Sequence, residues 1–386
     1  MLPRELDVNV NGDVIGKLHQ EQNRFIFSYN SKESQFLSLT MLPRVEQYIH
    51  DKLHPVFEMN LPEGYLLSII KKHFSKFTKT DDFGLLKLMS KSIKGRIAYG
   101  NVEKKANSSL SLDEVLAPSS PKLFEELVSR FALNSALSGV QPKVLATIEN
   151  KATLKYDDYI IKAWGEEYPQ LALNEYYCMK IVQYAGIEVP DFYISKDHKL
   201  FIMKRFDIKD DGLKIGFEDM CVLQAKQRDD KYEGSYEQIV KTIKTFTSPK
   251  YKKSSLRDFF KLIVINNIVQ NGDAHLKNFG LIYTNFSDIR LSPAYDVVST
   301  TAYIKNDIPA LHLLGSKKWW NKKNIIKFGT ESCDLKKSEA EQLYKICLEA
   351  SAKVSLEINQ LLLKGKLDEQ KRTVLEHIIK LIADSQ

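Results

Sequence analysis

The segment Asn271-Gly-Asp-Ala-His-Leu-Lys-Asn-Phe-Gly280 carries more information than any other in this chain. Its polar residues have the spacing of a phosphoryl-transfer site. Asp273 can accept the proton of a hydroxyl group, and Lys277 can hold a migrating phosphoryl group. Asn278 offers an oxygen atom to a magnesium ion. The segment therefore predicts a kinase-type catalytic loop.

A hairpin is predicted directly after this loop. Two short apolar runs, Phe279 to Tyr283 and Ile289 to Leu291, flank the polar stretch Thr284-Asn-Phe-Ser-Asp288. Because a hairpin returns its second strand beside its first, we expect Asp296 within metal-bridging distance of Asn278. Magnesium takes hard oxygen ligands and keeps most of its water, so one amide, one carboxylate and the phosphates of ATP suffice to hold it.

The residues before the loop predict a helix that ends just in front of Asp273. Ser255-Leu-Arg-Asp258 has the pattern of a capping box, the apolar run Phe259 to Val269 follows, and Gly272 is the predicted helix stop. The alternative is a polar loop in which Asp273 only caps a turn, because Asp, Asn and Gly are ordinary turn residues.

A second part of the chain adds a lysine and a glutamate to the predicted site. Asp158-Tyr-Ile-Ile-Lys-Ala163 is a short apolar strand that contains Lys162, and Leu171 to Val182 has a helical pattern closed by Gly186. A strand lysine that binds ATP phosphates and pairs with a helix glutamate is the usual kinase arrangement, so Glu175 is the predicted partner. The alternative is a strand-end lysine that faces solvent.

A phosphate-binding loop is predicted upstream of that strand. Ser138-Gly-Val-Gln-Pro-Lys143 precedes the strand Val144 to Ile148, and the backbone of Gly139 can approach a phosphate because glycine has no side chain. The segment lacks the full Gly-x-Gly-x-x-Gly pattern, so a plain turn is the alternative.

A set of short blocks occurs in one order along nearly the whole chain. The blocks are Val8 to Gly16, Leu61 to Gly64, Leu137 to Lys143, Ile160 to Lys162, Asn174 to Cys178, Lys204 to Asp207, Glu218 to Cys221, Asn271 to Asn278, and Tyr295-Asp296. In this order they resemble the HipA family of serine/threonine kinase toxins, although no single block is decisive.

The resemblance implies a fold and an activity. The fold would be α+β and protein-kinase-like, bilobal, with a small mixed α/β N-lobe, a β-rich N-terminal subdomain and a mostly α-helical C-lobe. The activity would be that of an ATP- and magnesium-dependent serine/threonine protein kinase that stops growth and is neutralised by a helix-turn-helix antitoxin of the HipB type. In studied members the substrate is an aminoacyl-tRNA synthetase, and DNA is reached only through the antitoxin.

The family's residue roles carry over to positions of this sequence. Asp273 resembles the general base, and Asn278 and Asp296 resemble the magnesium ligands. The predicted catalytic set is Asp273, Lys277, Lys162 and Glu175. The other nucleotide contacts would come from a phosphate loop (Ser138, Gly139, Val140, Gln141 and Lys143), from Lys162, from a hinge beside adenine (Met203, Lys204, Arg205 and Phe206), and from His275 and Lys277.

Two positions depart from the family pattern. Some relatives have a self-phosphorylated serine two residues before the position of Ser138, where this chain has Ala136. Ser138 stands directly before Gly139 and is the predicted site of autophosphorylation, because a phosphate there would repel the nucleotide. The alternative is a serine that satisfies a loop hydrogen bond. Lys204 stands in the hinge where an acidic residue stands in a relative.

Three domains are predicted, at residues 1–106, 107–210 and 211–386. The first is the N-terminal subdomain, the second is the small kinase lobe with the phosphate loop, and the third is the large lobe with the catalytic loop and the metal-binding aspartate. Small-lobe strands are predicted around Val144, Tyr159, Phe192 and Phe201, and the last two helices at Ser338 to Leu363 and Asp368 to Ile382.

The N-terminal subdomain is predicted to begin with β structure. Asn11-Gly12 joins two alternating runs and is a strong hairpin signal, and Arg24 to Tyr29 is a further strand. Helices are predicted at Glu63 to His73 and Asp82 to Leu88. The Ser- and Pro-rich stretch Asn107 to Pro121 is a predicted connector.

The composition is typical of a soluble globular protein. The 386 residues are 43% hydrophobic and 27% charged, enough for two or three packed domains. No apolar run approaches the ~18 residues that span a bilayer, and no signal-peptide core is present, so we expect a cytoplasmic protein without membrane contact. The cysteines, Cys178, Cys221, Cys333 and Cys347, have no metal-binding spacing and are predicted to be reduced packing residues.

The net charge of +7 permits an acidic partner but does not identify one. The lysine-rich stretches Lys241 to Lys253 and Lys317 to Lys327 are predicted as solvated faces, with contact to nucleic-acid phosphates as the alternative. Trp319-Trp320 is predicted to lie in the core rather than on a partner surface.

Two other functions remain open. A small-molecule or lipid kinase would use the same catalytic loop, although no membrane-binding amphipathic segment is present. A catalytically silent module would only join an operator complex, and it would have no physical need for Lys162, Asp273, Asn278 and Asp296 together. The preferred prediction is a protein serine/threonine kinase of the toxin type.

Overall fold

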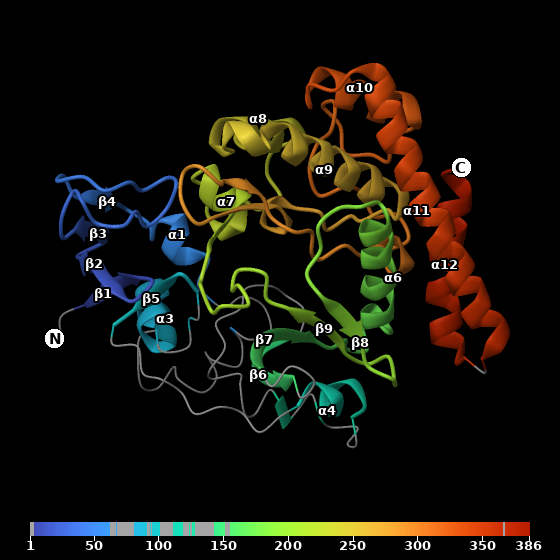
Figure 1. The fold of residues 1–386 in the computed structure, drawn as a ribbon, viewed down its shortest axis with the longest axis horizontal. Helices are drawn as coiled ribbons and strands as arrows, with labels where there is room; N and C mark the ends of the chain where they lie inside the picture. The colour runs from blue at the N-terminus through green and yellow to red at the C-terminus, as the bar shows by residue number, and fades with distance from the viewer. Residues whose placement is uncertain are drawn as a thin grey trace. The chain divides into compact units, whose positions relative to one another are not determined.

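The structure is a computed structural model (Figure 1). It describes residues 4–61, 81–90, 95–100, 111–118, 143–150, 155–365 and 367–386, together with Leu67, Ile93, Leu123, Glu126 and Leu127. The chain divides into two compact units. Unit 1 comprises residues 1–163, 195–197 and 202–230, and unit 2 comprises residues 164–194, 198–201 and 231–386.

Unit 1 begins with a five-stranded antiparallel sheet of order β4-β3-β2-β1-β5. Its strands are β1 (Glu5–Val10), β2 (Asp13–Glu21), β3 (Arg24–Tyr29), β4 (Tyr48–His50) and β5 (Ile97–Tyr99). Asn11 and Gly12 both have positive φ, 51° and 97°, as the two-residue turn of a tight hairpin requires. The predicted N-terminal hairpin and the strand at Arg24 to Tyr29 are confirmed.

Three short helices pack on this sheet and share its core. They are α1 (Pro55–Glu58), α3 (Asp82–Met89) and α7 (Met220–Leu223). The core contains residues from each of them, among them Phe57, Phe83 and Val222. Asp81 caps α3 through its side chain, which confirms the helix predicted at Asp82 to Leu88. Of the helix predicted at Glu63 to His73, Leu67 alone is among the described residues.

The remainder of unit 1 contains the strands that carry Lys162 and the predicted hinge. The strands β6 (Lys143–Asn150) and β7 (Lys155–Lys162) form an antiparallel pair, and β9 (Phe201–Lys204) neighbours β7. After β9 come β10 (Gly216–Asp219) and the short turn η3 (Arg228–Asp230).

The helix α4 (Leu112–Leu116) lies inside the stretch Asn107 to Pro121, which was predicted to be a connector without a helix being assigned to it. Ser111 and Glu114 form a reciprocal capping box at its start, and this local signal outweighs the Ser- and Pro-rich composition around it.

Unit 2 is mostly helical. Its helices are α6 (Leu171–Tyr184), α8 (Tyr236–Phe246), α9 (Pro249–Ile268), α10 (Lys322–Glu331), α11 (Lys337–Lys364) and α12 (Glu369–Asp384), with the short turns η4 (Leu276–Asn278) and η5 (Thr300–Ala302) and the strand β8 (Phe192–Ile194). The helix α11 packs on α6, α9, α10 and α12, and Figure 1 shows α11 and α12 side by side. The two predicted C-terminal helices and the four predicted strands β6 to β9 are confirmed.

The predicted hairpin after the catalytic loop is confirmed. The strands β11 (Gly280–Tyr283) and β12 (Arg290–Leu291) pair in antiparallel fashion. Asp288 closes the connection, because its carboxylate accepts hydrogen bonds from the backbone and the hydroxyl of Thr284. The buried Ser255 accepts a hydrogen bond from Leu291 N–H at 3.1 Å, which attaches the hairpin to α9.

Both predicted ends of α9 were wrong. The helix begins at Pro249, six residues before the predicted capping box, because proline is favoured in the first helical turn, so Ser255 is an interior residue. At the other end Gln270, not Gly272, takes the left-handed conformation, with φ 52°. Asn271 N–H donates to the carbonyl of Asn266 at 2.9 Å, which completes a Schellman-type helix end.

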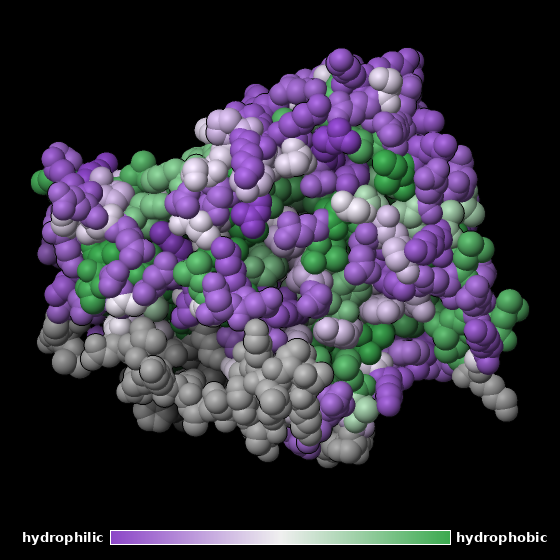
Figure 2. All heavy atoms as spheres, in the orientation of Figure 1, coloured by the Kyte–Doolittle hydropathy of each residue, from purple (hydrophilic) through white to green (hydrophobic). Residues whose placement is uncertain are grey.

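The surface and the cysteines agree with the sequence predictions. Cys178, Cys221, Cys333 and Cys347 are free and buried. Most of the lysines in the two lysine-rich stretches are exposed, and Figure 2 shows hydrophilic residues over much of the visible face of α8 to α11. In the part of the chain that the structure describes, no helix has the length and apolar character needed to cross a membrane.

Gly16 in β2 permits a close approach of the neighbouring strand. A Cβ atom at this position would lie 2.4 Å from the carbonyl oxygen of Ser28 and 2.7 Å from the ring of Phe27. We expect Gly16→Ala to lower the free energy of unfolding of unit 1 by about 1–3 kcal/mol, as overpacking does. Calorimetry should show a lower transition temperature. Gly165→Ala is the control, since its Cβ would meet nothing within 4 Å, and equal transitions in both variants would contradict the expectation.

Candidate active site

Hydrogen bonds on two sides hold the backbone of the loop that follows α9. The side-chain amide of Asn271 donates to Asn266 Oδ1 at 2.9 Å on the helix side. On the other side Gly272 N–H donates to Thr300 Oγ1 at 2.7 Å, and Thr300 Oγ1 donates to the carbonyl of Gln270 at 3.1 Å. The loop shape is therefore set by a helix before it and by a segment about 30 residues after it.

Gly272 is needed for a close approach and not for helix termination. A Cβ atom here would lie 1.9 Å from Asp307 Oδ2 and 2.8 Å from Thr300 Oγ1. A larger residue would displace the side chains of Asp307 and Thr300 from this position.

Asp273 points its carboxylate toward solvent from this fixed backbone. Its N–H donates to Asn271 Oδ1 at 3.2 Å, and 52% of its side chain is exposed. Tyr232 Oη donates to Asp273 Oδ1 at 2.8 Å. Partial desolvation, then the charges of Asp296 and Asp307, raise the pKa of Asp273, whereas the Tyr232 hydrogen bond and Lys231 oppose the rise.

His275 is a neutral residue beside this carboxylate. Burial, together with the charges of Lys231 and Lys277, lowers the pKa of His275 to about 3. Its Nε2 atom is 4.0 Å from Asp273 Oδ1, and the contact is therefore not an ion pair at neutral pH. Its Nδ1 atom is buried and has no hydrogen-bond partner among the described residues.

Asn278 and Asp296 lie next to each other, with oxygen atoms suited to a hard cation. Asn278 closes the short turn η4, and its Nδ2 atom donates to Asp296 Oδ2 at 3.1 Å. Asn278 Oδ1 is buried and has no hydrogen-bond partner among the described residues. Asp296 has φ 61°, a strained conformation of a kind that clusters at functional sites. One amide and one carboxylate fit magnesium, which fills its other positions with water and phosphate oxygens.

The remaining predicted residues of unit 2 lie on neighbouring elements. Lys277 is half-buried in η4, and its carbonyl accepts a hydrogen bond from Tyr295 Oη at 2.8 Å. Glu175 is fully buried in α6. The preceding residue, Asn174, exchanges two hydrogen bonds with the backbone of Ser299, at 2.9 and 2.8 Å, and so fixes the segment after Asp296 to α6.

The other predicted nucleotide contacts belong to unit 1. Lys162 is buried at the end of β7, and Lys143 is its register partner on β6. In the predicted hinge, Met203 is buried. Lys204 pairs with Asp157 at 3.2 Å and with Asp210 at 2.9 Å, which raises the pKa of Lys204.

The last two hinge residues have partners of their own in unit 1. Arg205 pairs with Asp207, and Phe206 packs edge-on against Phe217. Ser138, Gly139, Val140 and Gln141 lie outside the described residues, and so does Ala136. The structure therefore gives no geometry for the predicted phosphate loop before Lys143.

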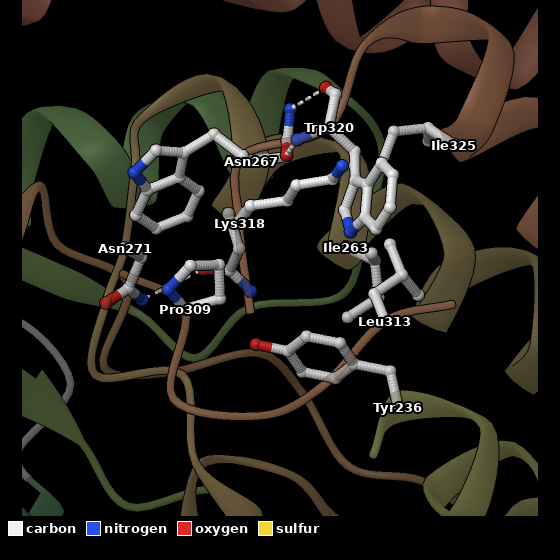
Figure 3. A pocket seen from close by; sticks show the side chains of 11 residues that line it. Tyr236, Ile263, Asn267, Asn271, Pro309, Leu313, Lys318, Trp320 and Ile325 are labelled. Atoms are coloured by element: carbon white, nitrogen blue, oxygen red, sulfur yellow. Dashed lines mark hydrogen bonds between the residues drawn. The ribbon is translucent and has the colours of Figure 1, made fainter. Parts of the chain in front are cut away.

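The tryptophan pair lines a small depression that also includes Asn271 of the loop (Figure 3). The depression is open to solvent, and the empty space in it, open solvent included, is about 300 Å³. Its lining residues are Tyr236, Ile263, Asn266, Asn267, Asn271, Pro309, Leu313, Lys318, Trp319, Trp320 and Ile325. Both tryptophans are half-buried, so the prediction of a core position was wrong. The indole Nε1 of Trp319 donates a hydrogen bond, whereas Nε1 of Trp320 is buried and has no hydrogen-bond partner among the described residues.

Hydrogen bonds from the tryptophans join the segment that carries Asp307 to α9. Trp319 Nε1 donates to the carbonyl of Asp307 at 3.1 Å, and the backbone of Trp320 exchanges two hydrogen bonds with the side chain of Asn267, at 2.9 and 2.8 Å. Lys318 lies 4.1 Å from the ring of Trp320.

Several residues with a direct part in this geometry were not predicted. Tyr232 lies 41 positions before Asp273, and Thr300 lies 28 positions after Gly272. Neither stands in a recognisable pattern. Asn174 and Asn271 fall inside the quoted blocks, but nothing in their spacing indicated that they join the loop to α6 and α9.

The fold and the loop together define a HipA-like protein. Residues 6–100 match the family model described as the HipA N-terminal domain, and residues 135–383 match the model described as the HipA-like C-terminal domain. The chain belongs to the HipA family, and the resemblance drawn from the sequence is confirmed.

Relatives with known sequences or structures agree with this assignment. A protein of Sinorhizobium fredii named putative kinase Y4dM is 26% identical over 81% of this chain and 81% of its own length. A putative kinase of Haemophilus influenzae is 32% identical over 44% of this chain, a region that spans 53% of that relative. The solved HipA of Shewanella oneidensis, in complex with HipB and operator DNA, superposes with a TM-score of 0.72 at 19% identity, over 98% of this chain and 96% of that one. The predicted α+β, kinase-like fold class is confirmed.

The Thr300 hydroxyl is expected to stabilise the loop that carries Asp273. In Thr300→Val the Gly272 N–H would lose its acceptor, and we expect the free energy of unfolding to fall by about 1–3 kcal/mol. Hydrogen exchange at residues 270–274 should become faster. Thr245→Val is the control, because that exposed hydroxyl only donates to the Lys241 carbonyl within α8. Unchanged exchange in Thr300→Val would refute the role.

Proposed function

We propose that this chain is an ATP- and magnesium-dependent serine/threonine protein kinase that acts as the toxin of a toxin–antitoxin pair. The observation that carries the proposal is that the anchored loop with Asp273 also holds Asn278, whose side chain is hydrogen-bonded to Asp296 on the segment after the hairpin. Two further facts support it: the chain belongs to the HipA family, and two relatives are named putative kinases.

Asn278 and Asp296 are the residues that would hold magnesium. The unpartnered oxygen of Asn278 and the adjacent carboxylate of Asp296 fit a hard divalent cation. When bound, magnesium would neutralise charge on the phosphates of ATP during transfer. Lys162 is proposed to bind the same phosphates and Glu175 to orient it, with Met203 to Phe206 beside the adenine.

Asp273 would act on the hydroxyl group of the substrate. The carboxylate accepts a hydrogen bond from that hydroxyl and takes its proton as the new oxygen–phosphorus bond forms. The bond to ADP breaks on the opposite side of the phosphorus atom. The neutral state of His275 suits a place along the nucleotide, because an uncharged ring does not compete with Lys277 for the migrating phosphoryl group.

The partners of the proposed kinase are proteins. The Shewanella HipA structure contains HipB and operator DNA, and we infer a HipB-like helix-turn-helix antitoxin for this chain as well. The protein substrate would be cytoplasmic, with an aminoacyl-tRNA synthetase as the first one to test. Ser138 remains the proposed site of autophosphorylation. A small-molecule kinase is the second candidate, because the anchored loop itself does not distinguish acceptors.

Transfer of label from ATP tests the two aspartates. We expect Asp273→Asn to lower the transfer rate by on the order of 10²–10⁴ while ATP binding persists. Asp296→Asn should lower the rate and also weaken magnesium-dependent ATP binding. Labelled phosphopeptides from a cell extract would identify the acceptor protein and serine, whereas label found only in small molecules would favour the second candidate.

Asp384→Asn is the matched control for this experiment, because Asp384 is an exposed residue at the end of α12. It should transfer phosphate like the parent protein. If Asp273→Asn retains full activity, Asp273 is not the general base.

DNA binding should depend on the antitoxin. A protein that binds DNA directly through its lysines loses affinity as salt rises, with a logarithmic slope of about −0.9 for each phosphate neutralised. We expect the purified chain alone to bind duplex DNA only weakly at physiological salt. Fluorescence anisotropy with and without a HipB-like protein measures this, and tight binding by the chain alone would contradict an indirect role.

A further inference from the structure

The backbone and the side chain of Asp273 are held by different groups. The backbone of the loop is fixed by Asn266, Thr300 and the hydroxyl of Tyr236, which donates to the carbonyl of Ala274 at 3.0 Å. Among the described residues, the side chain of Tyr232 is the one that donates a hydrogen bond to the carboxylate of Asp273. Loss of this bond would leave the shape of the loop intact.

Tyr232 is itself tied to the loop that it contacts. Leu276 N–H donates to the carbonyl of Lys231 at 3.0 Å, and Lys317 Nζ donates to the carbonyl of Tyr232 at 3.2 Å. The ring of Tyr232 lies edge-on to His275, with 5.1 Å between ring centroids. The phenol therefore contacts Asp273 from a backbone that is hydrogen-bonded to the same loop, although 43% of the residue is exposed.

We propose that Tyr232 is a positioning residue, whose hydroxyl fixes the rotation of the Asp273 carboxylate so that Oδ2 is free to accept the substrate hydroxyl. The inference rests on the proposed kinase function. Rotation about the last bond of an aspartate side chain is broad, so without a donor the carboxylate would populate many orientations. A donor at Oδ1, 2.8 Å away, selects one of them.

The same hydrogen bond affects the ionisation of the base. The charged groups near Asp273 are Lys231 on the segment of Tyr232, Lys277 on the loop, and Asp296 and Asp307 on the segment after the hairpin, while the adjacent His275 is neutral. Asp296 and Asp307 raise the pKa of Asp273, whereas Lys231 and the Tyr232 bond lower it. Removal of the hydroxyl should therefore raise the pKa of Asp273 further.

In a competing interpretation, the hydroxyl of Tyr232 occupies the position that the substrate hydroxyl would take. Its hydroxyl donates to Asp273 at 2.8 Å, the distance expected for a substrate hydroxyl, so a substrate would have to displace it. Under that interpretation, removal of the hydroxyl would raise activity and lower the KM for the acceptor. A positioning role predicts the opposite, a lower kcat at nearly unchanged KM.

The test compares the full-length parent protein with Tyr232→Phe and Tyr168→Phe. Tyr168 is an exposed tyrosine that packs on Tyr303, so its variant controls for the loss of a surface hydroxyl. The acceptors are peptides with a single serine from a degenerate library. For Tyr232→Phe we expect a kcat on the order of 10-fold lower, near-parental KM values for ATP and peptide, and an acidic limb of the pH profile moved to higher pH. Tyr168→Phe should match the parent.

A second measurement separates this inference from the proposed function. Carboxyl carbon NMR of aspartate-labelled protein, with Asp273→Asn to identify the signal, gives the pKa of Asp273 without any substrate. A higher pKa of Asp273 in Tyr232→Phe supports the contact even if no peptide is phosphorylated. The absence of peptide phosphorylation would count only against the proposed kinase function. An unchanged Asp273 pKa, an unchanged kcat, or a lower acceptor KM with higher activity would each overturn the positioning role.

Discussion

The candidate active site depends on one buried side chain, that of Asn271. Its amide donates to Asn266 Oδ1 in the last turn of α9, and its oxygen accepts the N–H of Asp273. The same amide lies 3.5 Å from the carbonyl of Asp296. A buried amide left without partners would cost about 1–3 kcal/mol, so the helix end, the proposed base and the segment with the proposed metal ligand are held in one arrangement.

This anchoring explains how three carboxylates remain close together. Asp296 and Asp307 both raise the pKa of Asp273, which means that their charges repel it in the folded protein. Such repulsion would favour an open loop if the backbone were mobile. The contacts of Thr300 with Gln270 and Gly272, and of Asn174 with Ser299, hold the chain on both sides of the carboxylates. The polar groups therefore stay near one another at the expense of some stability.

The sequence predicted the elements whose signals are local. Asn11-Gly12 specified a hairpin because both residues accept positive φ, and the runs around Thr284 to Asp288 specified another because a polar turn separated two apolar strands. The sequence predicted only those residues of the site that lie close together along the chain. Tyr232 and Thr300 reach the loop from distant positions through tertiary packing, and no short pattern encodes such contacts. The start of α9 was misplaced because Ser255 has the pattern of a cap but serves the hairpin instead.

Gly272 was correctly singled out from the sequence, but the structure gives a different physical reason for a glycine at this position. The sequence suggested a helix stop, whereas in the structure the side chains of Asp307 and Thr300 occupy the place where a Cβ atom would lie. Gln270 supplies the left-handed turn in its place, at a steric cost that the hydrogen bond between Asn271 and Asn266 offsets. The shape of the loop therefore depends on the segment from Asp296 to Asp307, whose Thr300 hydroxyl contacts both Gln270 and Gly272. The position of Asp273 thus depends on contacts from α9 on one side of the loop and from this segment on the other.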